Sequence, residues 1–93
     1  MTQAQSVDAK KTGMKSLMQK HKASVEEYYY VIEAVASVLF SKKKMPPGIE
    51  YNDLLSWGVF GLIKALDKFD DSKGVKFVTY ANIRVRGEML DMM

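Results

Sequence analysis

The stretch from Tyr51 to Asp91, YNDLLSWGVFGLIKALDKFDDSKGVKFVTYANIRVRGEMLD, decides the fold because it contains two helical patterns joined by one turn. Apolar residues in both halves recur at three- and four-residue spacing, which is the repeat of one face of an α-helix. Between the halves, the run from Asp70 to Gly74 is typical of a turn, since Asp and Ser bond to nearby backbone and Gly accepts a positive φ. We therefore predict one helix from about residues 50–52 to 69 and another from about residue 76 onward.

The first of these helices has two opposed stripes. The stripe that we predict to face the core contains Leu55, Val59, Leu62, Leu66 and Phe69. The opposite stripe, with the same spacing, contains Asp53, Trp57, Phe60 and Lys64. Exposed aromatic side chains framed by charges are common anchors of protein interfaces. We expect this second stripe to bind another protein. The alternative is that the N-terminal segment folds over Trp57 and Phe60 and completes the domain's own core.

The second helix also combines a core stripe with a polar and aromatic flank. Its predicted core residues are Val78, Ala81, Val85, Met89 and Met92. The flank contains Phe77, Tyr80, Ile83, Arg84 and Gly87. Two aromatic rings beside an arginine can stack on an unpaired base while the guanidinium pairs with phosphate. Judged by residue chemistry alone, packing within the fold is the more common role of such aromatics.

Upstream, a further helix is predicted from Ser24 to about Lys44. Ser24 and Glu27 have the spacing of a capping box, and Pro46-Pro47-Gly48 cannot continue a helix. Its predicted core residues are Tyr28, Val31, Val35, Val38 and Leu39. A short helix is expected over Met14–Lys22, preceded by a disordered basic arm over residues 1–13. The predicted fold is all-α, with three main helices and a short N-terminal one in a single domain over residues 14–93.

Composition narrows the function classes. A chain of 93 residues with 47% hydrophobic and 27% charged residues forms one small domain with a modest core. It has no cysteine, which excludes disulfides and cysteine chemistry and agrees with a reducing cytoplasm. No apolar run approaches the roughly 18 residues that a membrane helix needs. The net charge of +3 is concentrated in residues 1–23, which can meet phosphate or an acidic partner, or form a solvated tail.

Catalysis finds no support in the sequence. His21 is the only histidine, and no serine, cysteine or carboxylate partner accompanies it. A lone imidazole forms neither a catalytic triad nor a metal site. Gly58 and Gly61 lie inside a predicted helix rather than in a phosphate-binding loop, where they permit close helix packing. We therefore expect a non-enzymatic protein that needs no cofactor and no metal.

The run DLL..G..GLIKALDKFD..KGVKF.TYA..R.RG.MLD resembles conserved region 2 of bacterial RNA polymerase sigma factors, nearest the flagellar and sporulation branch. The resemblance implies that the helix over Asn52–Phe69 docks on the coiled-coil clamp helices of the largest polymerase subunit. The matching docking positions are Asp53, Ser56, Trp57, Phe60, Ile63 and Lys64. It also implies that the helix over Lys76–Met92 captures bases flipped from the nontemplate strand as a promoter melts. The matching DNA-contacting positions are Lys76, Phe77, Tyr80, Arg84 and Arg86.

Three departures from the family pattern qualify this expectation. Ile83-Arg84 stands where housekeeping sigma factors carry two tryptophans, which supports the flagellar branch and weakens the melting surface. Ser56-Trp57 replaces the Gln-Glu or Gln-Ala that is usual there. The chain ends at Met93, before the residues that read the −10 promoter element in the family.

The sequence therefore predicts a protein that docks on RNA polymerase core and has a partial capacity to hold melted, single-stranded promoter DNA. An anti-sigma factor is a further expected partner, and a membrane is not. Two alternatives remain open. One is a non-transcriptional helical module that uses the Trp57/Phe60 face to self-associate or to bind another protein. The other is a truncated sigma factor that acts as a decoy for the polymerase.

Overall fold

The computed structural model describes residues 16, 18–42 and 45–93. Within this part of the chain every regular element is helical. The elements are α3 (Lys22–Glu27), α4 (Tyr29–Lys42), α5 (Tyr51–Lys68), the short 3-10 helix η1 (Asp71–Lys73) and α6 (Phe77–Met92). The all-α prediction with three main helices and a short N-terminal one is confirmed. The predicted arm over residues 1–13 and most of the start of the helix predicted from Met14 lie outside the described residues.

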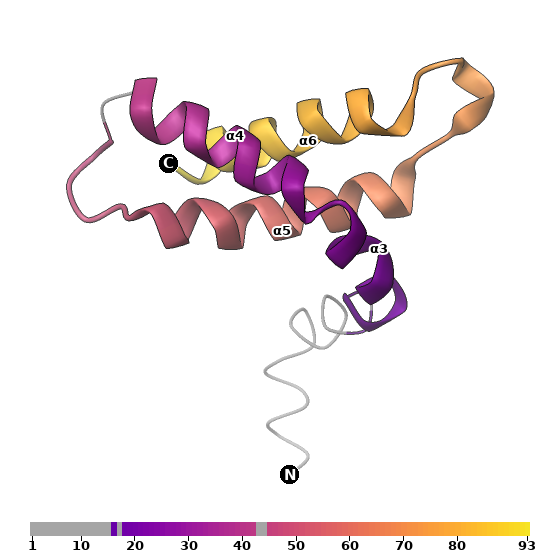
Figure 1. Cartoon of the computed structure of the whole chain (residues 1–93), viewed down its shortest axis with the longest axis horizontal. Helices are drawn as coiled ribbons and strands as arrows, with labels where there is room; N and C mark the ends of the chain where they lie inside the picture. Colours follow the sequence, from indigo (N-terminus) through magenta and orange to yellow (C-terminus); the bar gives the residue numbers. More distant parts are fainter. Residues whose placement is uncertain (1–15, 17, 43–44) are drawn as a thin grey trace, which may run out of the picture.

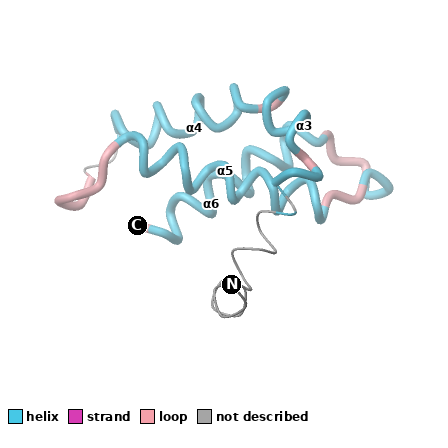
Figure 2. The backbone as a smooth tube through the Cα atoms, turned by 90° about the horizontal axis from the view of Figure 1, so that it is seen from below, coloured by secondary structure: helices cyan, strands magenta, loops and turns pink. Residues whose placement is uncertain are grey.

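The three main helices pack in two layers. Helices α5 and α6 run antiparallel and are joined at one end by the turn that contains η1 (Figure 1). Helix α4 lies over both of them and packs against each (Figure 2). Helix α3 packs against α4 and also against α5. The α5 and α6 pair is thus held by α4 on one side.

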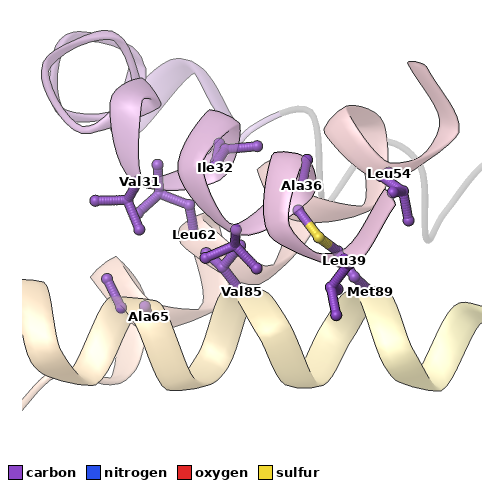
Figure 3. Packing of buried hydrophobic residues seen from close by; sticks show 11 residues of the cluster. Val31, Ile32, Ala36, Leu39, Leu54, Leu62, Ala65, Val85 and Met89 are labelled. Carbon is purple, nitrogen blue, oxygen red and sulfur yellow. The ribbon is translucent and has the colours of Figure 1, made fainter. Parts of the chain in front are cut away.

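The core lies where these three helices meet, and all of its residues are apolar (Figure 3). Its members are Val31, Ile32, Val35, Ala36, Leu39, Leu54, Leu62, Ala65, Ala81, Val85 and Met89. On α6 the predicted core residues Ala81, Val85 and Met89 are confirmed, and Val78 packs against them from a partly buried position. Met92 is 48% exposed, so its predicted place in the core is wrong. It is the last residue of α6, where the helix ends.

On α5 the buried face differs from the predicted one. The fully buried positions are Leu54, Gly58, Gly61, Leu62, Ile63 and Ala65, whereas Leu55, Val59 and Leu66 are only partly buried. At 100° per residue, the face that meets α4 and α6 is rotated by about 75° from the predicted stripe. The physical reason is that glycine and alanine allow close helix approach but carry no weight in a search for large apolar residues.

The predicted helix start at Ser24 is also wrong. Helix α3 runs through Ser24 from Lys22, and the Ser24 carbonyl accepts a bond of 2.9 Å from the Tyr28 N–H. The break comes instead at Tyr28, after which α4 begins at Tyr29. On α4, Val31, Val35 and Leu39 are buried as predicted, while Val38 is 52% exposed. Ile32 and Ala36 take the place in the core that the sequence pattern assigned to Val38 and Tyr28.

The other helix boundaries agree with the local signals in the sequence. Helix α5 begins at Tyr51, and the Glu50 N–H donates to Asp53 Oδ2 at 2.8 Å. At the predicted turn, Asp70 Oδ1 accepts from the Ser72 hydroxyl at 2.6 Å and from the Ser72 N–H at 3.0 Å. Gly74 follows with a φ of +76°. These bonds reverse the chain so that α6 returns along α5.

Candidate functional site

The predicted docking residues of α5 stay on one side of a continuous helix. Asp53, Trp57, Phe60 and Lys64 fall within about 60° of one another at helical spacing, with Ser56 beside them. Ser56 is exposed and the other four are partly buried. We call these five residues the α5 outer face. The predicted grouping is therefore present, although its aromatic rings are less exposed than the sequence pattern suggested.

The α5 outer face borders α6 and is partly engaged with the fold. Trp57 packs against the core residues from its partly buried position, whereas Phe60 does not belong to that group. Lys64 Nζ lies 3.0 Å and 3.2 Å from the two carboxylate oxygens of Glu88 on α6. The Asp53 carboxylate accepts the Glu50 N–H bond at the start of α5. Among the described residues, Phe60 and Ser56 are thus the two members of this face without core packing, an ion pair or a side-chain hydrogen bond.

Ile63 does not belong to the α5 outer face in this structure. Its exposed fraction is 0%, although it lies about 180° around α5 from Leu54. Helix α5 is therefore buried on a second side as well as on the side that meets α4 and α6. This burial does not favour the docking role that the family resemblance implies for Ile63, because a side chain without exposed surface contacts a partner only if the fold opens.

The aromatic residues of α6 take part in a cluster at one end of the molecule. The Phe77 ring lies 4.9 Å from the Tyr28 ring and 5.1 Å from the Phe69 ring, measured between centroids. The Tyr80 ring lies 5.6 Å from that of Phe69. Such distances are typical of stabilising aromatic pairs. Phe77 therefore has aromatic neighbours from two other parts of the chain and is a packing residue, whereas Tyr80 has one such neighbour.

Tyr80 lines a shallow groove with a volume of about 130 Å³ beside the turn. The other lining residues are Lys68, Phe69, Asp70, Lys73 and Val75. Bonds from the Ser72 hydroxyl and then from the Ser72 N–H hold the pKa of Asp70 below its ordinary value of 3.8. Lys68 and Lys73 were missed as candidate residues. The separation of Lys68 and Lys73 from Tyr80 along the sequence gives no signal of a contact, because it is the turn that brings the three residues together.

The predicted basic residues of α6 separate into two groups. Arg84 is exposed and lies about 40° from Tyr80 around the helix axis, and Lys76 is exposed directly before the first residue of α6. Arg86 lies about 160° from Arg84. It lines a different groove, between α4 and α6, together with residues of α4. The structure therefore brings Lys76, Phe77, Tyr80 and Arg84 together and does not bring Arg86 to them.

Comparison with known proteins assigns this arrangement to a family. Residues 25–93 match the family model of sigma-70 region 2. The chain belongs to the sigma-70 region 2 family. The matched range contains all of α4, α5 and α6, so the candidate residues of the sigma region 2 domain on α5 and α6 lie within the family match.

Individual relatives point to the flagellar branch. The chain is 37% identical over 67 residues to RNA polymerase sigma factor FliA of Pseudomonas aeruginosa, covering 72% of this chain and 26% of that protein. It is 47% identical over 47 residues to the RNA polymerase sigma-D factor of Bacillus subtilis, covering 50% of this chain and 18% of that protein. FliA of Salmonella typhimurium is 46% identical over 48 residues, with 52% and 20% covered. No solved structure matches the chain.

The sigma region 2 domain spans about a fifth to a quarter of the length of these relatives. Sigma factors act in transcription initiation and are not enzymes, which agrees with the expectation of a non-catalytic protein. None of the helices in the described ranges combines the length and the hydropathy that a membrane span requires.

Proposed function

We propose that this sigma region 2 domain docks on RNA polymerase core and contributes to promoter melting during transcription initiation. One observation carries the docking part. Asp53, Ser56, Trp57, Phe60 and Lys64 form one face of a single rigid helix, and the family match covers that helix completely. The partner on the polymerase is the pair of coiled-coil clamp helices of the largest subunit.

The two aromatic rings contribute differently to docking. Phe60 is partly buried and lies outside the core group, so partner contact can bury the rest of its ring. Trp57 already packs against the core, so its ring helps to hold the α5 outer face in place. Burial of a central aromatic anchor is a common source of interface affinity. Phe60 is therefore the residue whose removal separates docking from folding.

Promoter melting would use the surface around Tyr80. Its ring lies at a groove wall beside Phe69, and Lys76 and Arg84 are exposed on the same side of α6. An unpaired base of the nontemplate strand would stack on Tyr80, and the two cations would pair with phosphates. Phe77 positions this surface by packing between Tyr28 and Phe69. A protein with these partners acts in the cytoplasm, where an anti-sigma factor would be a further partner.

The docking proposal is tested by measuring binding to purified polymerase core. Phe60→Ala should weaken binding by about 2 kcal/mol if the ring is a central anchor. Phe40→Ala is the matched control, because Phe40 is an exposed phenylalanine on α4 whose ring meets that of Tyr51 edge to face and does not belong to the α5 outer face. Circular dichroism checks that both variants stay folded. Equal affinity of wild type and Phe60→Ala for the core would exclude this face as the docking site.

A further inference from the structure

A groove lies between α4 and α6, and no part of the proposed function uses it. Its volume is about 340 Å³. The lining residues are Ala34, Val35, Val38, Leu39, Asn82 and Arg86. Four of the six are aliphatic, and they come from consecutive turns of α4. The groove beside Tyr80, with about 130 Å³, is smaller and lies on a different side of α6.

Two of the lining residues, Val38 and Arg86, are exposed, and contacts within the described fold do not account for this exposure. Val38 is 52% exposed although its neighbours on the same side of α4, Val35 and Leu39, are buried. Arg86 is exposed, and the one ion pair found in the described residues joins Lys64 to Glu88 instead. A partner with apolar side chains and a carboxylate can cover this surface favourably. Burial of the apolar atoms stabilises the complex, and the carboxylate pairs with the cation in place of the water that it loses.

The positive charge of the groove indicates which kind of ligand it can bind. Asn82 Nδ2 donates to the Val78 carbonyl at 3.1 Å, which holds the amide in place and adds no charge to the groove. Lys42 follows Val38 by one helical turn on α4 and is exposed, so it adds a second positive charge at one end. No lining residue is acidic. The complementary ligand therefore has aliphatic side chains for the floor and a carboxylate for Arg86.

We propose that this groove, between α4 and α6, binds the apolar and acidic face of a short amphipathic helix from a partner protein. A helix laid in a groove presents side chains three and four residues apart, which suits walls that are themselves two helices. The lysine-rich residues at the chain's own N-terminus have the wrong charge for Arg86. A stacked nucleic-acid base is disfavoured because the floor is aliphatic rather than aromatic.

The test uses a phage-displayed library of helical peptides with one face randomised, selected against the wild-type chain. The expected clones combine leucine or isoleucine with a glutamate or aspartate one turn away. Their binding should fall about tenfold or more in Arg86→Glu, since opposite charges become like charges. Replacing the peptide's acidic residue with lysine should restore binding to Arg86→Glu. The nitrogen-proton correlation spectrum of the wild type should show peptide-induced shifts at Val38 and Asn82.

Arg84→Glu is the matched control. It makes the same change of net charge, at an exposed arginine about 160° away on α6, and should leave peptide affinity unchanged. Selection that yields no binders, or binders indifferent to Arg86→Glu, would overturn the proposal. So would two other results: oligo-dT shifting the Val38 and Asn82 signals, which would make the groove a nucleic-acid site, or a dimer that Arg86→Glu dissociates. Polymerase binding by Arg86→Glu should stay at the wild-type level, so this proposal and the docking proposal fail separately.

Discussion

At the scale of single residues, Gly61 sets how closely α5 and α6 approach. A Cβ atom at this position would lie 2.9 Å from the Val85 Cα and 3.0 Å from the Arg84 carbonyl oxygen. Both atoms belong to the α6 backbone, which cannot move without moving the helix. At Gly58 the closest atoms are Ile32 Cγ2, on the branched Cβ, and Met89 Cε, at the end of a flexible side chain. The two glycines therefore differ in how much change their surroundings can absorb.

Gly61→Ala should destabilise the domain by about 1 to 3 kcal/mol, because the added methyl forces α6 away from α5. Gly58→Ala should also destabilise the domain: Met89 Cε can move with its flexible side chain, but Ile32 Cγ2 is attached to the branched Cβ of a buried residue and has little freedom to move. Gly87 lies in α6 with no atom near its would-be Cβ, so Gly87→Ala should be neutral or more stable by up to about 1 kcal/mol. Urea unfolding followed by circular dichroism measures all three variants. A Gly61→Ala chain as stable as the wild type would contradict the close approach.

Asp70 gives a prediction about acid stability. Its bonds from Ser72 lower the folded-state pKa below 3.8, so the folded state favours the charged carboxylate. A lowered pKa contributes stability above the unfolded-state value, and this contribution disappears as the pH falls through the folded-state value. The thermal midpoint of Asp70→Ala should thus be lower than that of the wild type at about pH 7 and should approach it at about pH 2.5. A constant difference across that range would mean that Asp70 charge has no part in the turn.

At the scale of elements, the aromatic cluster ties three parts of the chain together. Tyr28 lies between α3 and α4, Phe69 follows α5, and Phe77 begins α6. The centroids of the Tyr28 and Phe69 rings lie 4.9 Å and 5.1 Å from that of the Phe77 ring. Because these residues stand at helix ends, their contacts decide how the ends meet, while the core decides how the middles pack. The surface around Tyr80 depends on this junction.

Phe77→Ala and Tyr80→Ala should therefore have different consequences. Phe77→Ala should lower stability by about 2 to 4 kcal/mol, since it removes a ring packed against two others. Tyr80→Ala should cost less stability but lower the affinity for single-stranded promoter DNA by about 1 to 3 kcal/mol. Thermal unfolding and fluorescence anisotropy with a labelled oligonucleotide measure the two effects. Unchanged DNA affinity in a folded Tyr80→Ala chain would remove Tyr80 from the proposed melting surface.

At the scale of the whole molecule, the docking and melting surfaces lie on different helices of one small body. The α5 outer face and the Tyr80 groove are joined by the α5 and α6 pair, which the Lys64 and Glu88 side chains bridge. Lys64 is 42% and Glu88 16% exposed, so solvent screens this ion pair and its contribution to stability is modest. Packing along Gly58 and Gly61 holds the two surfaces in a constant relation.

A polypeptide of these 93 residues in excess should compete with a full-length sigma factor for polymerase core and lower promoter-specific transcription. Its affinity should fall below that of the full-length factor, because linked modules gain avidity from each further contact. An in vitro transcription assay with core enzyme, a full-length sigma factor and a promoter template measures the competition. Phe60→Ala should compete less and Phe40→Ala as well as wild type. No competition at saturating excess would favour a self-associating helical module instead.

The sequence by itself determined the helix boundaries on both sides of the turn and the family. Those features depend on neighbouring residues: the Asp53 bond to the Glu50 N–H, the Asp70 bonds to Ser72 and the positive φ of Gly74 all form within a few positions. The start of α4 was predicted wrongly because the same kind of local signal was misleading there. Ser24 and Glu27 have capping spacing, but a helix already passes through Ser24.

Only the tertiary structure decided which side of each helix is buried. Val38 is open to solvent, although the apolar spacing predicted it in the core, and Ile63 has no exposed surface, although the family resemblance placed it on the docking face. Gly61 packs closely against the α6 backbone, as its position inside a helix predicted, but the sequence did not indicate which helix it would meet. The structure also separates Arg86 from Arg84, two residues apart in sequence and on different grooves in space. Burial depends on which other helices approach and how closely, and the spacing of residues along one helix does not contain that information.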